Sequence, residues 1–398
     1  MYQLNVTENM QCQLANRSAL SDQHRFQRDG IHLFCGDSLR LCAEWPSPTA
    51  IVVDGPYGIG SFPGDPVTPD GLAEWYEPHI AEWSRKATPE TTLWFWNTEV
   101  GWATVHPIFT AYDWEYRSCH TWNKGIGHVA GNANTKTLRK FPVVSEVCAQ
   151  YVRRVRLPSG GESLPLKEWL RREWLRTGLP LSITNFACGV ANAATRKYFT
   201  KCHLWYFPPP DHFEKLVQYA NANGRPAGRP YFSVDGNNPL SASEWARMRA
   251  KFYCEYGINN VWSEPPVRGS ERLKHGLKCV HLNQKPLKLI EMIIRATSDV
   301  GDVIWEPFGG LCSAAVAAHN LQRRCYSAEI LPEYYEFAHG RLAAKNGNKE
   351  NTSSAAHAKN NRKTRASEIT EGRRTPARQT SPSRKGAAPS GLAALFPL

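Results

Sequence analysis

Four short apolar runs, each ending beside an acidic residue, constrain the fold of this chain more than any other feature. They read IHLFC (31–35), AIVV (50–53), DVIWE (302–306) and RCYSAE (324–329), and the acids are Asp37, Asp54, Glu306 and Glu329. Such runs are typical of strands buried on both faces of a parallel sheet. Helical patterns at 283–298, 312–323 and 331–346 alternate with the last two runs, which predicts an α/β fold. Residues 91–99 and 141–152 are further strand candidates.

The charge balance allows two interpretations. The 398 residues include 48 Lys and Arg against 36 Asp and Glu, a net charge of +12. Residues 346–398 hold +7 of this charge in a segment rich in Ser, Thr, Asn, Ala and Pro, which predicts a disordered basic tail. The balance therefore indicates either a polyanionic partner or a basic tail on an unrelated enzyme.

Cysteine spacing and hydropathy exclude several classes of protein. The 11 cysteines are scattered without a C-x-x-C pair, so we expect neither disulfides nor a zinc site, and no metal. We interpret most of them as small core residues in a reducing cytoplasm. No apolar run approaches the ~18 residues of a membrane span, and the N-terminus lacks an apolar signal core. These features predict a soluble cytoplasmic protein.

Composition divides the chain into five segments. They are a polar N-terminal extension (1–30), two α/β halves (31–154 and 278–345), a mainly helical insertion (155–277) and the tail (346–398). In the insertion, apolar residues from Leu166 to Trp174 stand near helical spacing, and Gly178 follows as a stop. Further helical segments at 181–189 and 190–201 are compatible with a helix-turn-helix unit, and a merely helical insertion is the alternative. The Gly/Asn-rich basic stretch 123–140 predicts a mobile loop.

The segment Asp54-Gly55-Pro56-Tyr57 directly follows one of the buried runs. A carboxylate and a neighbouring backbone carbonyl can accept both protons of an NH₂ group, and the tyrosine ring can stack on a base turned out of a duplex. The competing interpretation is an ordinary turn that begins with aspartate.

The segment Ile304-Trp305-Glu306-Pro307-Phe308-Gly309-Gly310 predicts a strand, a glycine turn and then a helix. Such a turn opens a pocket for a nucleoside cofactor at the carboxyl edge of an α/β sheet. The spacing lacks G-x-G-x-x-G, which makes a dinucleotide cofactor an unsuitable ligand. Glu329 ends the next run, where a carboxylate can hold ribose hydroxyls.

Taken together, these segments resemble the DNA amino-methyltransferases that act on adenine N6 or cytosine N4, and within them the β class of restriction-modification systems. In that class a D-P-P-Y segment comes first, then a target-recognition region, then an F-x-G-x-G segment. Here Asp54–Tyr57 precedes Phe308–Gly310 in that order, and three further segments match: Gly36-Asp37, the Lys285-Pro286 pair, and the run ending at Glu329. The resemblance covers 31–150 and 278–345. It departs from the family at Gly55, Glu306 and Cys312, where the family has Pro, Asp and Gly.

The resemblance implies a Rossmann-like sheet that binds S-adenosylmethionine, with a target-recognition region inserted at 155–277. Asp54 and the Gly55 carbonyl would hold the target amino group, with Pro56 shaping the turn and Tyr57 stacking on the flipped base. The implied cofactor residues are Asp37, Lys285, Pro286, Glu306, Phe308, Gly309, Gly310 and Glu329. No metal is needed, because the methyl group of the sulfonium is already activated.

Double-stranded DNA is the implied partner, in a prokaryotic or phage cytoplasm and in contact with the nucleoid. Candidate DNA contacts are Lys124, Arg139 and Lys140 near the catalytic segment, and Arg196 and Lys197 in the insertion. The family leaves open a cognate restriction endonuclease and a homodimer. In the family, a catalytic segment that begins with Asp, as Asp54–Tyr57 does, favours adenine N6 as the target. The alternatives are cytosine N4, an inactive DNA-binding relative, and an enzyme that methylates RNA or protein amino groups.

Overall fold

A nine-stranded mixed sheet forms the centre of the computed structural model, which describes residues 25–60, 62, 64–125, 139–268, 272, 274–275, 278–279 and 284–343. The strand order is β1-β2-β13-β12-β3-β4-β6-β5-β9. Five neighbouring strands, β2, β13, β12, β3 and β4, run parallel, whereas β1 and β6 run antiparallel to their neighbours. The strands are β1 (Arg25–Arg28), β2 (Ile31–Cys35), β3 (Ala50–Val53), β4 (Thr92–Asn97), β5 (Trp114–Asn123), β6 (Ser145–Arg153), β9 (Val261–Trp262), β12 (Val303–Glu306) and β13 (Arg324–Glu329).

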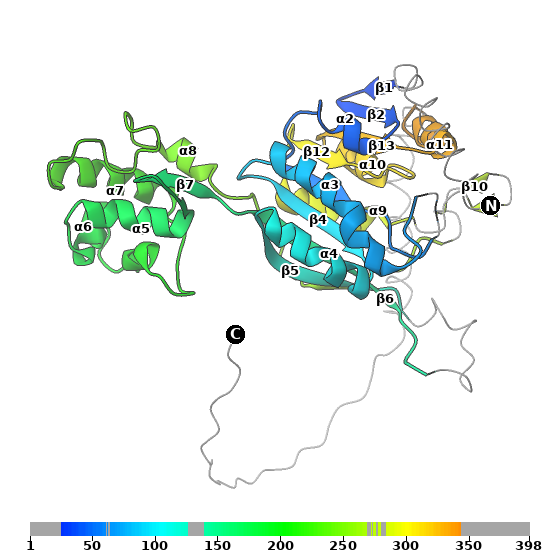
Figure 1. Ribbon diagram of the computed structural model, residues 1–398, viewed down its shortest axis with the longest axis horizontal. Coiled ribbons are helices and arrows are strands. Elements are labelled where there is room, and N and C mark those ends of the chain that lie inside the picture. Colours follow the sequence, from blue (N-terminus) through cyan, green and yellow to red (C-terminus); the bar gives the residue numbers. More distant parts are fainter. Residues whose placement is uncertain are drawn as a thin grey trace, which may run out of the picture. The chain divides into compact units, whose positions relative to one another are not determined.

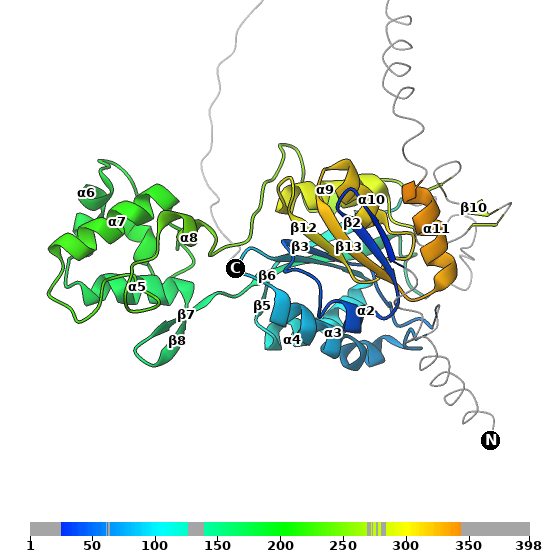
Figure 2. The same ribbon diagram turned by 90° about the horizontal axis from the view of Figure 1, so that it is seen from above.

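Helices cover both faces of this sheet, as Figures 1 and 2 show. One face carries α9 (Leu287–Thr297), α10 (Ser313–Asn320) and α11 (Pro332–Ala343), and the other carries α3 (Leu72–Lys86) and α4 (Glu99–Ala111). Alternate residues of one strand enter different cores, because side chains along a strand point to opposite faces. Val52 packs with α9 and α10, and its neighbour Val53 packs with α3 and α4. The predicted α/β fold is therefore confirmed.

The strand order reverses between β3 and β12. From β3 the chain passes through α3 to β4 on one side, and from β12 it passes through α10 to β13 on the other. In open α/β sheets, ligands bind at such a reversal, beyond the carboxyl ends of the strands. Because β2, β3, β12 and β13 are parallel, the four acids predicted to end the runs lie at this one edge.

The helical insert, defined here as residues 155–251, has a hydrophobic core of its own. The core is built around Trp169, Trp174, Phe213 and Trp245, all buried. Its elements are β7 (Arg156–Ser159), β8 (Glu162–Pro165), α5 (Leu166–Arg176), η3 (Leu181–Ile183), α6 (Thr184–Cys188), η4 (Thr195–Phe199), α7 (Pro210–Asn223) and α8 (Ala242–Ala246). The predicted first helix is confirmed as α5.

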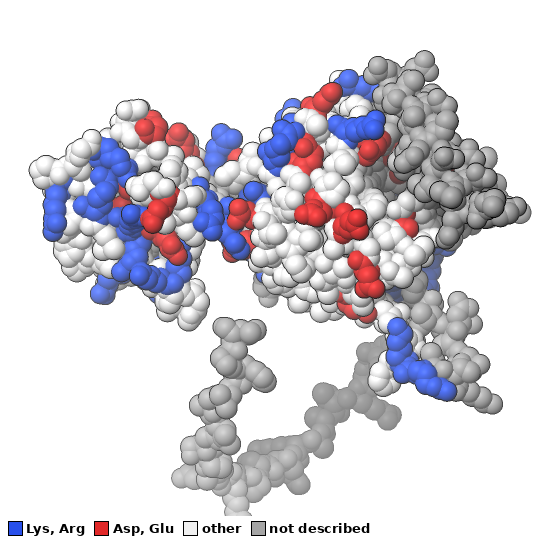
Figure 3. All heavy atoms as spheres, viewed as in Figure 1, with Lys and Arg blue, Asp and Glu red and all other residues white. Residues whose placement is uncertain are grey.

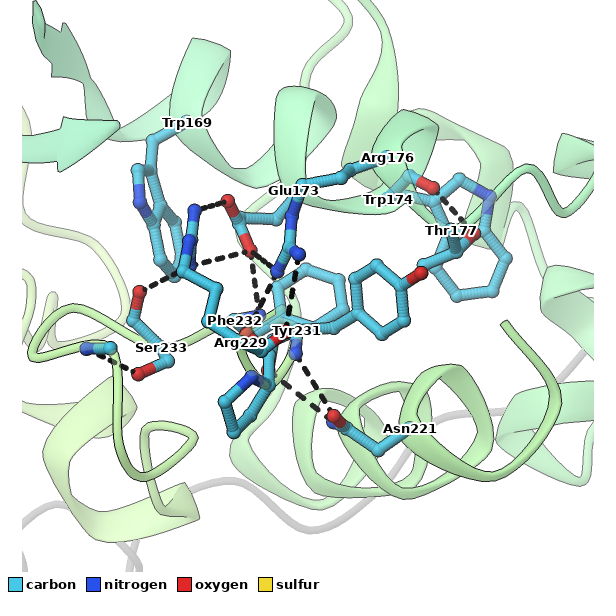
Figure 4. Close-up of polar contacts among 12 residues, drawn as sticks. Trp169, Glu173, Trp174, Arg176, Thr177, Asn221, Arg229, Tyr231, Phe232 and Ser233 are labelled. Carbon is cyan, nitrogen blue, oxygen red and sulfur yellow. Dashed lines mark hydrogen bonds and ion pairs between the residues drawn. The ribbon is translucent and has the colours of Figure 1, made fainter. Parts of the chain in front are cut away.

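Buried charges lie beside this core, as Figure 4 shows. The fully buried carboxylate of Glu173 pairs with Arg176 at 2.8 Å and with Arg229 at 2.6 Å, and it accepts the Phe232 backbone N–H at 2.9 Å. Because the bonds to Arg229 and Phe232 join α5 to the segment 229–232, the cluster fixes that segment against the helix.

Several expectations are corrected by the structure. The segment predicted as a third helix, 190–201, contains only η4, a five-residue 3-10 helix, so no recognition helix forms there. The hydrogen bonds of a 3-10 helix have poorer geometry than those of an α-helix, and such helices are therefore short. Strand β1 of the sheet lies inside the predicted N-terminal extension, 1–30. Strand β9 of the same sheet lies inside the predicted insertion, 155–277. Most of the predicted mobile loop, 126–138, and the predicted tail lie outside the described residues.

No helix in the described part of the chain is both long and apolar enough to cross a membrane. Among the same residues, no three His, Cys, Asp or Glu side chains are grouped so that they could hold a metal ion. The nine cysteines whose side chains are described are all free thiols.

Candidate functional site

A cavity of about 410 Å³ opens at the carboxyl edge of the parallel strands. Its size falls in the range of pockets that bind small molecules. The loops after β2, β3, β12 and β13 all contribute to its walls. The predicted catalytic and cofactor residues that line it are Asp37, Asp54, Gly55, Pro56, Tyr57, Lys285, Glu306, Phe308, Gly309, Gly310 and Glu329. Pro286 is buried behind the wall as the N-cap of α9.

Lys285 joins two carboxylates at one end of this cavity. Its Nζ donates to Asp54 Oδ1 at 2.8 Å and to Tyr57 Oη at 3.0 Å, and it lies 3.3 Å from Glu146 Oε2. Tyr57 Oη lies 3.0 Å from Asp54 Oδ1 and 3.2 Å from Glu146 Oε2. Lys124 binds the other oxygen of Glu146, Oε1. Asp54, Tyr57, Lys285, Glu146 and Lys124 thus form one connected cluster, here called the catalytic-edge cluster.

Burial and charge act against each other in this cluster. Burial alone would lower the pKa of Lys285, but Asp54 and Glu146 overcome it and raise that pKa. Burial alone would raise the pKa of Glu146, but Lys285 and Lys124 overcome it and lower that pKa. Burial, with the nearby Asp54 and Glu146, raises the pKa of Tyr57 well above its usual value. At neutral pH these shifts keep Lys285 as an ammonium group, Glu146 as a carboxylate and Tyr57 as a neutral phenol.

The unusual glycine of the catalytic segment has a steric reason. A Cβ at Gly55 would lie 2.6 Å from Phe308 Cδ2 and 2.6 Å from Tyr76 Oη, closer than any such contact allows. The next carbonyl, that of Pro56, accepts hydrogen bonds from Tyr76 Oη and Asn97 Nδ2, each at 3.0 Å. The turn is thus held by α3 and β4, although it lacks the family's first proline. In the described part of the chain, the Gly55 carbonyl accepts no hydrogen bond.

Aromatic rings surround Phe308, which also lines the cavity. Trp75, Tyr76, His79 and Trp83 of α3 all have ring centroids within 6.1 Å of the Phe308 ring. Burial lowers the pKa of His79 to about 4, so this ring is neutral at physiological pH. The wall here is therefore apolar and uncharged.

Three predicted cofactor carboxylates make hydrogen bonds to backbone N–H groups. Glu306 Oε1 accepts from Ala314 N at 2.7 Å, and its Oε2 accepts from Ala315 N at 3.1 Å, so this carboxylate caps α10. Glu329 accepts from Gly310 N at 2.6 Å and from Leu331 N at 2.7 Å. Asp37 caps α2 (Ser38–Leu41) through Leu39 N at 2.9 Å. Burial raises the pKa of Glu306 and that of Glu329 to about 7.

The five predicted DNA contacts lie in different surroundings. Lys124 is largely buried and belongs to the catalytic-edge cluster, and its role as a DNA contact stays a prediction. Arg139 and Lys140 are exposed at the end of segment 126–138, and Arg196 and Lys197 are exposed on η4.

Sequence reasoning did not identify Glu146 as a site residue. It stands on β6 within the predicted strand 141–152, and a carboxylate inside an otherwise apolar strand was the signal that could have revealed it. Trp75, Tyr76 and His79 were missed because α3 was not predicted at all.

Fold and site together define an α/β protein with a small-molecule cavity at the switch point of its sheet, bounded by an Asp-Gly-Pro-Tyr turn and a Phe-Gly-Gly turn. Residues 212–340 match the model of a family described as DNA methylase. The predicted resemblance to the N4-cytosine/N6-adenine DNA methylase family is thereby confirmed.

Two curated relatives are type II methyltransferases. One is M.BglII from Bacillus subtilis, 31% identical over 136 residues, a match that covers 34% of this chain and 34% of that protein. The other is M.ScaI from Streptomyces caespitosus, 25% identical over 194 residues, covering 48% of this chain and 58% of that protein. The matches thus span between a third and three fifths of the relatives' length.

Two solved structures align with most of this chain and share little sequence with it. The complex of M1.HpyAVI with SAM has a TM-score of 0.43 at 14% identity, covering 78% of this chain and 98% of that one. The cytosine-N4-specific PvuII DNA methyltransferase has a TM-score of 0.45 at 11% identity, covering 80% and 88%.

Proposed function

We propose that this protein transfers a methyl group from S-adenosylmethionine to the exocyclic amino group of a base in double-stranded DNA, with adenine N6 as the favoured target. The observation that carries the proposal is that one cavity joins the Asp54–Tyr57 turn to the Phe308–Gly310 turn. The first supplies hydrogen-bond acceptors for an amino group, and the second supplies an apolar wall and close backbone approach for a nucleoside.

The cavity residues fit S-adenosylmethionine. Phe308 and Trp75 offer flat apolar surfaces for the adenine, and the Glu329 carboxylate at the cavity wall can accept hydrogen bonds from ribose hydroxyls. When bound, this cofactor supplies an electrophilic methyl group. Glu306 lines the same cavity, but its carboxylate caps α10, so we assign it to shaping the turn rather than to holding the cofactor.

The catalytic-edge cluster can orient an amino group. Both hydrogen bonds that Asp54 receives fall on Oδ1, from Lys285 and Tyr57, which leaves Oδ2 for one amino N–H of the substrate. The Gly55 carbonyl can accept the second N–H, and together the two bonds fix the direction of the nitrogen lone pair. Asp54 is also placed to take the proton that the nitrogen loses after transfer. Lys285 Nζ lies 5.3 Å from the Tyr57 ring centroid, which leaves the opposite face for stacking a base.

The helical insert supports DNA as the substrate. It carries 14 Lys and Arg against 7 Asp and Glu, a net charge of +7, whereas the chain outside the insert and outside residues 346–398 has 24 against 26, a net charge of −2. Figure 3 shows basic side chains on the face of the insert that it presents. A concentrated positive charge attracts the phosphate backbone and releases its counterions.

The test is methyl transfer from labelled S-adenosylmethionine to unmodified duplex DNA, followed by mass spectrometry of the nucleosides. We expect N6-methyladenine; N4-methylcytosine would keep the enzyme class and overturn the base. Asp54→Ala should lower turnover by about 10³-fold or more while leaving the dissociation constant for the cofactor within about twofold. Asp70→Ala, at an exposed aspartate, is the matched control. Cofactor binding without transfer to any duplex, or preferential transfer to RNA, would reject the proposal.

A further inference from the structure

Resting on the proposed function, we infer that Glu146 is a positioning residue for methyl transfer, which keeps Lys285 shared between two carboxylates so that Asp54 remains a free acceptor. Glu146 is not among the residues that line the cavity. It reaches the site through its contacts with Tyr57 Oη and Lys285 Nζ, which do line it. Its part in the reaction is therefore indirect.

The geometry of Lys285 explains why a second carboxylate is needed. An ammonium group has three N–H donors, and the three acceptors around Nζ are Asp54 Oδ1, Tyr57 Oη and Glu146 Oε2. The side chain is only 3% exposed, which limits the replacement of a lost acceptor by water. Without Glu146, the ammonium would keep only Asp54 as an anionic partner, and the Asp54 carboxylate would be held more tightly by it.

Lys124 extends the same arrangement on the other side. It binds Glu146 Oε1, and its side chain is 12% exposed. With both lysines and both carboxylates present, the catalytic-edge cluster is neutral. Glu146→Gln would leave two ammonium groups against the single carboxylate of Asp54. The proposed reaction needs Asp54 to accept a hydrogen bond from the substrate amino group. The excess positive charge weakens Asp54 as an acceptor, so we expect methyl transfer to slow.

Among the residues that the structure describes, Cys148 on β6 and Tyr76 on α3 are two further titratable groups that feel the charge of Asp54. Both are buried, and burial raises the pKa of each well above its usual value, so both are neutral. The charge change in Glu146→Gln is therefore felt by Asp54, Lys285 and Lys124 and by no third carboxylate in the cluster.

The experiment compares kcat, the cofactor dissociation constant and the pH dependence of kcat in the wild type, Glu146→Gln, and Glu146→Gln combined with Lys124→Met. In the single variant we expect kcat to fall ten- to a hundredfold with cofactor affinity within twofold, and the acid limb of the kcat profile to move to lower pH. The double variant restores neutrality and should recover at least a fifth of wild-type kcat. Lys124→Met alone and Glu115→Gln, a partly exposed glutamate on β5, are the controls.

A second measurement does not depend on activity. Lys124 and the exposed Lys140 are labelled with acetic anhydride in the full chain and quantified by peptide mass spectrometry. We expect Lys124 to be protected relative to Lys140 in the wild type and at least fivefold more reactive in Glu146→Gln.

Three results distinguish failure of the proposed function from failure of the positioning role. A wild type without methyl transfer would reject the proposed function, and the labelling would still decide whether Glu146 holds its lysine. An active wild type whose Glu146→Gln variant keeps kcat, the acid limb and the protection of Lys124 would overturn the positioning role alone. A fall in kcat that Lys124→Met does not relieve, with an unmoved acid limb, would also overturn it.

Discussion

Two buried clusters of opposite charges occupy different parts of the chain, and their acceptor oxygens are used differently. In the helical insert, both oxygens of Glu173 are filled by Arg176, Arg229 and the Phe232 N–H, and its side chain has no exposure (Figure 4). At the sheet edge, Asp54 receives its bonds on one oxygen, and its side chain is 28% exposed.

The difference distinguishes an ion cluster whose acceptors are all used within the fold from one that leaves an acceptor for a ligand. A buried carboxylate is stable only when donors replace the water it has lost, and Glu173 meets that condition fully. Asp54 meets it only in part, with the open oxygen facing a cavity.

Glu173→Gln should destabilise the insert by about 3–5 kcal/mol, because it removes a fully buried anion that compensates two partly exposed guanidinium groups. The free energy of unfolding is measured by urea denaturation, with Glu168→Gln on the exposed face of the same helix as the control. A loss below about 1 kcal/mol would mean that the buried cluster does not hold the insert together.

Glu306→Gln should flatten the pH dependence of stability. Burial raises the pKa of Glu306 from 4.5 to about 7, so between these values the folded state keeps a proton that the unfolded state has lost. Stability must then fall as pH rises through this window, by about 3 kcal/mol from this group. Unfolding at pH 5 and pH 8 measures the fall, with the exposed Glu74→Gln as the control. An equal slope in Glu306→Gln and the wild type would contradict the assignment.

Gly55→Ala should cost about 1–3 kcal/mol of stability and weaken cofactor binding, because the new methyl group would push Phe308 and Tyr76 apart. Thermal unfolding and titration with S-adenosylmethionine provide the measurements. Gly228→Ala, where a Cβ would meet nothing within 4 Å, serves for comparison. Wild-type behaviour of Gly55→Ala would show that packing does not explain the glycine.

Arg196→Ala and Lys197→Ala should each reduce the slope of log affinity for DNA against log salt by about 1, with little effect on folding. The measurement is DNA affinity by fluorescence anisotropy between low and moderate salt. Lys288→Ala, at an exposed lysine outside the insert, is the matched control. Slopes unchanged in both η4 variants would place the phosphate contacts elsewhere.

The sequence predicted those elements whose pattern of apolar residues reflects how they are buried in the fold. Strands β2, β3, β12 and β13 were visible as apolar runs, since strands covered on both faces contain little else. Helix α9 was visible because one of its faces is apolar. In contrast, α3 was missed: it places Trp75, Tyr76 and His79 against Phe308, and its interior Pro78 and mean polarity hide the pattern.

The order of the motifs predicted the class of chemistry and the residues at the turns, because catalytic turns and cofactor turns are short and locally encoded. The contacts that these residues make could be seen only in the folded protein. Glu306 caps α10, Lys285 binds Asp54, and Lys124 binds Glu146, which β6 brings to the site. The ring of Phe308 leaves no room for a side chain at Gly55. These contacts join residues up to 253 positions apart, such as Gly55 and Phe308, and depend on which parallel strands lie side by side. Local sequence propensity does not specify which strands are neighbours in the sheet, because that order depends on the burial of side chains on both faces of the sheet.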